Sequence, residues 1–243
     1  MFGRFLRNII VLSGFWAVGS TVVHAEDRFI KNGFWDINVY PYLSDADNDG
    51  RVTMNAAANF SGGLSYFGFI NFGKQQSAGA TRNAYYTEQN LRWRFARDLP
   101  LELAVQLNFR TGVDNDRYRL GLRWRASDTE FLTDAFKAIH LTYAVSIYAL
   151  QLDHEAGRAW QIEHSFRFAF PYLSDRLYLS GFVDHNFGQV LPDSFPSDPI
   201  VAEAQFGYRL YDKLFAISEF RINEYRRSNV SSLGVGLQYK INW

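Results

Sequence analysis

Apolar and polar residues alternate along most of this chain, and the alternation is clearest in residues 231–243, SSLGVGLQYKINW. Every second side chain there is apolar, and the residues between are small or polar. A period of two predicts a β-strand with one apolar and one polar face. The apolar face points to the core in a soluble sandwich. In an outer-membrane barrel it points to lipid, and the polar face lines the lumen.

The same alternation recurs from residue 34 to the end of the chain. Its segments have about the 9–11 residues that a tilted membrane-spanning strand needs. We expect strands at 34–42, 51–60, 63–74, 84–95, 101–111, 117–126, 137–152, 159–170, 177–188, 200–211, 214–225 and 231–243. The pattern predicts an all-β fold, a transmembrane antiparallel β-barrel of about twelve strands.

The connections between these segments also alternate in character. Tight, turn-rich connections are expected at 62–63, 97–100, 171–176 and 212–213. Longer or more acidic ones are expected at 44–50, 75–83, 112–116, 153–158 and 189–199. This favours short periplasmic turns on one rim and longer extracellular loops on the other. The stretch 127–136 departs from the pattern, because it is a long connection on the short-turn side, and it is a candidate for a helical turn.

Residues 1–25 have the pattern of a secretory signal peptide. Arg4 and Arg7 precede an apolar stretch at 9–18, and small residues stand near Ala25, where cleavage is expected. We therefore assign 1–25 to a signal peptide and 26–243 to the barrel. Export together with a barrel pattern predicts a location in the bacterial outer membrane.

Composition agrees with this assignment. The chain has 243 residues, 17% aromatic residues, no cysteine and a formal net charge of zero. Aromatic residues suit the girdles at the two membrane interfaces of a barrel. A neutral chain is not expected to bind nucleic acid, and the absence of cysteine excludes disulfides and thiolate metal sites. We expect no cofactor and no metal site.

A barrel implies particular partners. These are the outer-membrane bilayer with its lipopolysaccharide, the barrel assembly machinery and a small-molecule solute. Tyr239, Ile241 and Trp243 resemble the C-terminal signal that barrels present to that machinery. We expect a monomer.

Charged residues on the alternating segments set which face is the lumen. A cationic side chain facing mid-bilayer lipid costs about 2–4 kcal/mol, and acidic side chains cost less. The following charges are therefore expected to point inward: Arg92, Arg94, Arg119, Arg123, Arg125, Glu163, Arg167, Glu203, Arg209, Glu219 and Arg221. Arginines dominate the first half and acids are frequent in the second. Two interpretations remain open: a field across the lumen that orients dipolar solutes, or paired charges that plug the barrel.

Aromatic residues also occupy the inner register, at Tyr40, Phe67, Phe69, Tyr86, Tyr148 and Phe182. They are candidates for stacking on a planar solute. The alternative is packing inside a narrow barrel, since small barrels fill their interiors with side chains.

Two other patterns carry less chemistry. Asp45, Asp47 and Asp49 have the spacing that begins a calcium loop, but Ala56 stands where the bidentate glutamate is needed, which favours a solvated loop. His164 and Ser165 suggest a lipase pair. Neighbouring residues on a strand point to opposite faces, so these two side chains are not expected to meet.

Four strand-like motifs resemble the Tsx-type nucleoside-specific channel family. They are WDINV at 35–39, YFGF at 66–69, YRLGL at 118–122 and LYLSGFVDHNF at 177–187. The resemblance implies a narrow barrel with aromatic and ionisable residues along a nucleoside path. By position it makes Phe67, Phe69, Phe182, Asp184 and Asn186 candidates for that path. The shorter loops and the arginine-rich first half of the lumen depart from the family pattern.

Together these patterns predict a channel through which small polar solutes diffuse, with nucleosides as the expected solute. Its expected path adds Arg119, Arg123, Arg125 and Tyr148 to the residues implied by the resemblance. Two alternatives stay open: a closed barrel with a structural or surface-binding role, and an enzyme acting on outer-membrane lipids.

Overall fold

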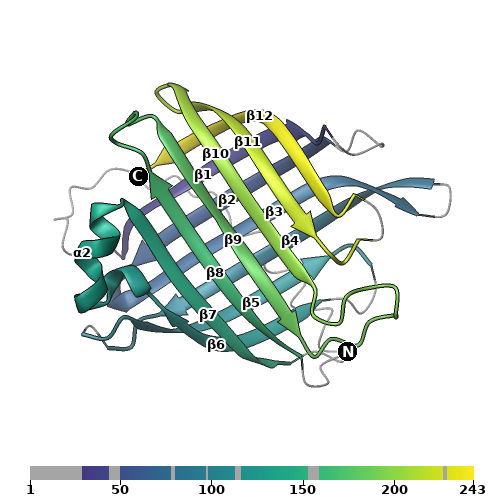
Figure 1. Cartoon of the computed structure of the whole chain (residues 1–243), viewed down its shortest axis with the longest axis horizontal. Helices are drawn as coiled ribbons and strands as arrows, with labels where there is room; N and C mark the ends of the chain where they lie inside the picture. The colour runs from purple at the N-terminus through teal and green to yellow at the C-terminus, as the bar shows by residue number, and fades with distance from the viewer. Residues whose placement is uncertain are drawn as a thin grey trace.

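The computed structural model describes residues 29–43, 50–77, 80–96, 98–112, 116–152, 159–226 and 229–243. Within them, twelve strands form one closed antiparallel barrel (Figure 1). The strands are β1 (Ile30–Pro41), β2 (Gly50–Phe60), β3 (Leu64–Ser77), β4 (Ala80–Trp93), β5 (Leu101–Arg110), β6 (Arg117–Trp124), β7 (Leu141–Gln151), β8 (Trp160–Ala169), β9 (Leu177–Phe187), β10 (Ile200–Tyr211), β11 (Leu214–Asn223) and β12 (Ser231–Asn242). The predicted fold class and strand number are confirmed.

The barrel closes between its first and last strands. β1 pairs with β12 from Phe34↔Asn242 to Val39↔Leu237. Beyond that ladder, Gly33 N donates to Trp243 O at 3.0 Å and Trp243 N donates to Gly33 O at 3.1 Å. Every described strand therefore has a partner on both sides, which removes the unpaired edges that make open sheets associate.

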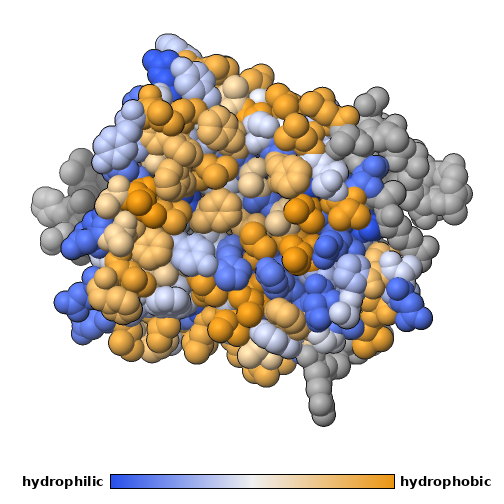
Figure 2. Space-filling model, in the orientation of Figure 1, coloured by the Kyte–Doolittle hydropathy of each residue, from blue (hydrophilic) through white to orange (hydrophobic). Residues whose placement is uncertain are grey.

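The alternation is inverted relative to a soluble protein. On β12, Val235 and Leu237 are 48% and 51% exposed, whereas Ser232 and Gln238 are buried at 2% and 3%. The exposed surface is thus apolar and the interior polar, as a lipid-facing barrel requires. Figure 2 shows apolar side chains over much of one outer face.

Four exposed aromatic residues stand near the short-turn rim, and they are Trp93, Trp124, Tyr211 and Trp243. The strand ends at Ile30 and Asn242 lie at the same rim.

Two predicted boundaries are wrong. The loop expected at 75–83 is mostly strand, because β3 and β4 continue to pair as far as Ser77↔Ala80. The strand expected to begin at residue 137 begins at Leu141, because a helix occupies the residues before it.

That helix belongs to the long connection on the short-turn side. A 3₁₀ turn, η2 (Ala126–Asp128), is followed by α2 (Glu130–Ala138), which confirms the helical turn expected there. Another 3₁₀ turn, η1 (Ser61–Gly63), joins β2 to β3. No helix within the described residues is long and apolar enough to cross a membrane. The expected signal peptide at 1–25 and the aspartates of the calcium-like loop lie outside the described residues.

Candidate functional site

A cavity of about 440 Å³ lies in the barrel lumen. Inward-facing side chains from eleven strands line it, and β5, which is fully described, contributes none. Its polar lining includes amides, hydroxyls, carboxylates and cations, and its apolar lining is mainly phenylalanine. A volume of this size falls within the range of about 300–1,000 Å³ that small-molecule sites occupy.

A group of bonded side chains explains why β5 is excluded. Arg92 Nη2 on β4 lies 3.8 Å from Glu163 Oε1 on β8. Gln106 Nε2 on β5 donates to Glu163 Oε2 at 3.2 Å, and Tyr148 OH on β7 donates to Asn90 Oδ1 at 3.1 Å. We call these five residues the lumen bridge. Because it joins β4 to β8 across the intervening strands, it separates the β5–β7 wall from most of the cavity.

The cavity lining includes five phenylalanines, and the three that the sequence predicted lie on opposite walls. Phe67 and Phe69 both come from β3, with ring centroids 6.3 Å apart, and Tyr86 continues the row at 5.7 Å from Phe69. Phe182 comes from β9, on the far side of the closed sheet. The sequence left the register of β3 poorly specified, since both its faces are apolar. The structure places Phe67 and Phe69 toward the lumen and Phe72 toward lipid, where it is 43% exposed.

Three other predicted path residues lie outside the cavity lining. Tyr148 is fully buried within the lumen bridge. Asp184 and Asn186 are 8% and 3% exposed, and Asn186 Nδ2 donates to Pro199 O at 3.2 Å. They belong to the inward register of β9 but lie farther along the strand than Phe182.

The three predicted arginines of β6 and its end differ in their surroundings. Arg119 Nη1 donates to Gln106 Oε1 at 2.6 Å and to Asn108 Oδ1 at 3.0 Å, so its guanidinium is bonded within the β5–β6 wall. Arg123 lines the cavity and pairs with Glu102 at 2.8 Å. The predicted basic wall is thus partly neutralised by carboxylates on its own strands.

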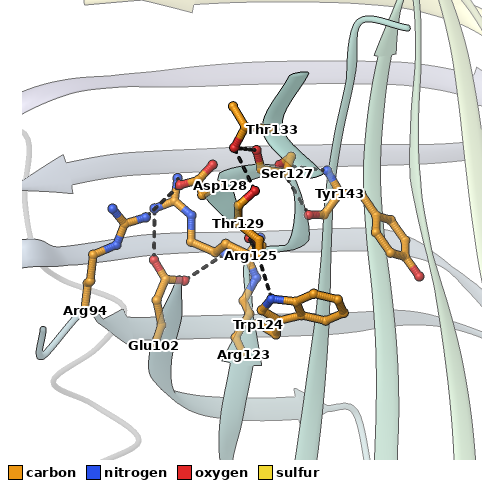
Figure 3. Close-up of polar contacts among 10 residues, drawn as sticks. All are labelled: Arg94, Glu102, Arg123, Trp124, Arg125, Ser127, Asp128, Thr129, Thr133 and Tyr143. Carbon is orange, nitrogen blue, oxygen red and sulfur yellow. Dashed lines mark hydrogen bonds and ion pairs between the residues drawn. The ribbon is translucent and has the colours of Figure 1, made fainter. Parts of the chain in front are cut away.

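Arg125 is bound at the short-turn rim (Figure 3). Its guanidinium lies 3.2 Å from Glu102 and 2.6 Å from Asp128, and Arg94 reaches the same Asp128 oxygen at 2.8 Å. Trp124 Nε1 donates to Thr129 Oγ1 at 2.8 Å, just before α2 begins. These contacts fasten the long connection to the barrel wall.

A second bonded group stands across the lumen from the bridge. The hydroxyls of Tyr40 and Tyr42, on and just after β1, both donate to Glu219 Oε1, at 2.8 and 2.7 Å. The guanidinium of Arg221 lies 4.1 Å from the centre of the Tyr42 ring. Sequence reasoning missed this group, because β1 and β11 are far apart in the chain and meet only when the barrel closes.

The His164–Ser165 pair is split between the two faces of β8. Ser165 lines the cavity. His164 faces outward, where its Nδ1 lies 2.6 Å from the hydroxyl of Tyr143. The ring of His185, on the neighbouring strand β9, lies against His164 with ring centroids 5.9 Å apart. The predicted separation of His164 and Ser165 is confirmed.

The comparisons with known proteins agree with the geometry of the fold. No protein-family model matches the chain, and no curated protein matches it. Among solved structures it is similar to the NanC porin, with a TM-score of 0.53 and 9% identity over 85% of this chain and 100% of that one. It is also similar to the KdgM porin, with a TM-score of 0.50 and 13% identity over 85% of this chain and 98% of that one. The KdgM porin has also been solved in complex with disordered oligogalacturonate.

These likenesses concern the fold. The chain shares the closed twelve-stranded barrel fold of these outer-membrane porins.

Proposed function

We propose that this protein is an outer-membrane channel for small polar solutes and that nucleosides are among them. The observation that carries the proposal is the pair Phe67 and Phe69 along one wall of a polar cavity, faced by Phe182 on the other, with Tyr86 packed behind Phe69. Aromatic faces stack on planar bases with about 1–3 kcal/mol per base in nucleic-acid binders. Carboxylates and amides nearby supply partners for ribose hydroxyls.

The charges of the lining favour a solute without large net charge. Asp36, Glu88, Glu163, Glu203 and Glu219 stand against four cations, Arg92, Arg123, Arg167 and Lys240. A lining this balanced does not select strongly for an anionic chain such as the oligogalacturonate of the KdgM complex. The lining can then select a solute by ring stacking and hydrogen bonds. The binding must stay weak enough for the solute to leave the channel.

The test is solute flux into proteoliposomes. We expect the unmodified protein to admit uridine faster than a sugar of similar size, because only uridine has a planar base. Replacing Phe67 and Phe69 together by alanine should remove this preference and leave sugar flux nearly unchanged. Phe72→Ala, on the lipid face of the same strand, is the matched control and should keep the preference. Equal loss of uridine and sugar flux in the double variant would sink the stacking proposal.

A closed structural barrel is the second candidate, and the lumen bridge favours it. The bridge and the buried polar side chains of β5 to β7 fill part of the lumen. Absence of ion conductance from correctly folded protein would support this candidate over the channel.

We further propose that the protein assembles as a monomer through the barrel assembly machinery, with Tyr239, Ile241 and Trp243 as its signal, in a bilayer bearing lipopolysaccharide. Closure of one chain between β1 and β12 supports the monomer. The lipid-facing positions of Tyr239 and Trp243, which are 43% and 56% exposed, support the signal.

A further inference from the structure

The connection between β6 and β7 is longer than a hairpin needs. Residues Ser61–Gly63 suffice to join β2 to β3, and Asp212 and Lys213 suffice to join β10 to β11. Between Trp124 and Leu141 the chain instead forms η2 and α2 at the same rim, beside the start of β7 (Figure 1). Because reversing the chain does not require a helix, the helix indicates an additional role for this connection.

The sequence of α2 gives the helix one apolar side. Apolar residues recur at positions i, i+1, i+4, i+5 and i+8, which share one face of a helix. They are Phe131, Leu132, Ala135, Phe136 and Ile139, the last directly after α2. The polar residues fall on the other side: Glu130, Thr133, Asp134 and Lys137. An apolar helix face normally packs on a protein core, but no residue of α2 is buried.

The contacts of α2 with the barrel show which side of the helix is left open. Thr133 Oγ1 lies 3.3 Å from Ser127 O in η2 (Figure 3). The Phe136 ring stacks on the Tyr143 ring of β7, with centroids 6.1 Å apart. These two residues therefore turn toward the barrel. Phe131 points away from it and is 82% exposed.

The open side of α2 continues the lipid-facing surface of the barrel. Tyr143 belongs to the outward register of β7, as does Ile147, which is 48% exposed. Because Phe136 stacks on Tyr143, the helix rests against the outer surface of the wall. Trp124, an exposed aromatic residue of the rim, donates through Nε1 to Thr129 Oγ1 just before α2. Such aromatic residues stand at the membrane interface, so α2 begins at the height of the lipid headgroups.

The neighbouring turn between β8 and β9 adds apolar side chains at the same rim. Tyr172 and Leu173 are 87% and 77% exposed. The Tyr172 ring lies 5.4 Å from the ring of His140, which follows α2 by two residues. We call the four exposed residues of this region the rim patch: Phe131, Ile139, Tyr172 and Leu173. Exposed apolar side chains gathered in this way mark a surface that binds protein or membrane.

We propose that the rim patch is an interfacial anchor that binds phospholipid in the leaflet at the short-turn rim. Its side chains lie in the boundary between headgroups and acyl chains, as the apolar face of an interfacial helix does. Lipid is the occupant because the patch is continuous with the surface that lipid already covers. Glu130, Asp134 and Lys137 carry both signs of charge, so burial of apolar area drives the binding rather than attraction to anionic lipid. The anchor does not depend on whether the lumen conducts.

The chain contains no cysteine, so one introduced cysteine carries a single spin label. The test compares Phe131→Cys, on the apolar side of α2, with Lys137→Cys, on its polar side, in phosphatidylcholine vesicles. We expect dissolved oxygen to reach the label at 131 and a water-soluble nickel complex to be excluded from it, at a depth of about 5–10 Å below the headgroup boundary. The label at 137 should show the reverse preference. Both native side chains are exposed, so neither change disturbs the packing of the barrel.

Further variants test whether the rim patch acts as a unit. With the label at 131, the double change Ile139→Asp, Leu173→Asp should move the label out of lipid and remove its preference for oxygen. Val190→Asp is the matched control, because Val190 is 92% exposed in the loop after β9, at the opposite rim. It should leave the depth of the label unchanged. Equal depths in all three proteins would overturn the role of the patch.

Other occupants of the rim patch would give different results, and each would overturn the inference. A nickel complex that reaches the label at 131 as readily as the label at 137 would place α2 in water. A label at 131 shielded from both probes would mean that protein covers the patch. Shielding that disappears as lipid dilutes the protein would identify that cover as a second copy of the chain. Insertion only into vesicles that contain phosphatidylglycerol would overturn the apolar account, which predicts the same depth without anionic lipid.

Discussion

Arg92 on β4 and Glu163 on β8 form an ion pair across the lumen, with Nη2 3.8 Å from Oε1. Three strands, β5, β6 and β7, lie between them along the wall. The pair therefore spans a chord of the barrel, and Gln106 and Ser146 add hydrogen bonds to the same carboxylate. The chord leaves most of the cavity lining on β1–β4 and β8–β12, while Arg123 of β6 and two residues of β7 still reach it.

The first prediction concerns the stability of this chord. We expect Glu163→Gln to lower the free energy of unfolding by about 1–3 kcal/mol, because it leaves the nearly buried Arg92 without a carboxylate. Arg92→Gln should cost a similar amount. The double variant should lose less than the sum, since neither charge is then left alone. Unfolding in denaturant, followed by tryptophan fluorescence, measures all three.

The exposed pair Arg209–Asp175 serves as the control for the chord. Its side chains are 39% and 80% exposed, so its removal should cost under ~1 kcal/mol. Strictly additive losses in the Arg92 and Glu163 variants would show that the two side chains do not stabilise each other.

The second prediction concerns ion preference. We expect Arg123→Gln to shift the reversal potential in a salt gradient toward cation preference, because Arg123 lines the cavity and charged walls set selectivity in pores. Arg119→Gln should shift it less, because Arg119 is bonded among Gln106 and Asn108 in the wall. Equal shifts from the two variants would contradict this placement of the path.

The third prediction concerns closure of the barrel. A Cβ added at Gly33 would lie 2.4 Å from Ala57 O and 2.7 Å from Trp243 Cζ2. We therefore expect Gly33→Val to reduce the fraction of heat-modifiable, folded barrel, because it separates β1 from its neighbours on both sides. Electrophoresis of unheated membranes measures that fraction.

Trp243 faces Gly33 across the same seam and gives the matched test. We expect Trp243→Asp to impair assembly, since it removes an interfacial aromatic residue and places a charge toward lipid. Trp243→Phe should restore most of the folded barrel. Normal amounts of folded Trp243→Asp protein would refute the role of this residue in assembly.

Much of the fold could be predicted because the period of two is a local signal. The cost of placing charges toward lipid set which face of each strand meets the lumen, and the apolar rows of β5 and β12 then had to face lipid. The predicted inward placement of Phe67 and Phe69 is confirmed, although the apolar residues on both faces of β3 specify its register poorly.

The arrangement inside the lumen could not be predicted, because it depends on contacts between strands far apart in sequence. The period of two predicts that Tyr148 faces the lumen. It does not predict that the Tyr148 hydroxyl reaches Asn90 on β4, a contact that keeps the ring out of the cavity lining. Likewise it identifies Arg119 as inward but not as bonded within the wall. The sequence predicts a loop at 75–83 because these residues are mostly polar or small. The strands β3 and β4 continue through them, because backbone pairing does not require apolar side chains.

The most direct test of the channel is single-channel recording in planar bilayers, using the unmodified protein and the double variant Phe67→Ala, Phe69→Ala. We expect discrete conductance steps from both proteins, since neither phenylalanine carries charge. Added uridine should lower the mean current through the unmodified channel and have little effect on the variant. Folded protein that gives no conductance steps, or uridine block that is equal in both, would contradict a solute path along these phenylalanines.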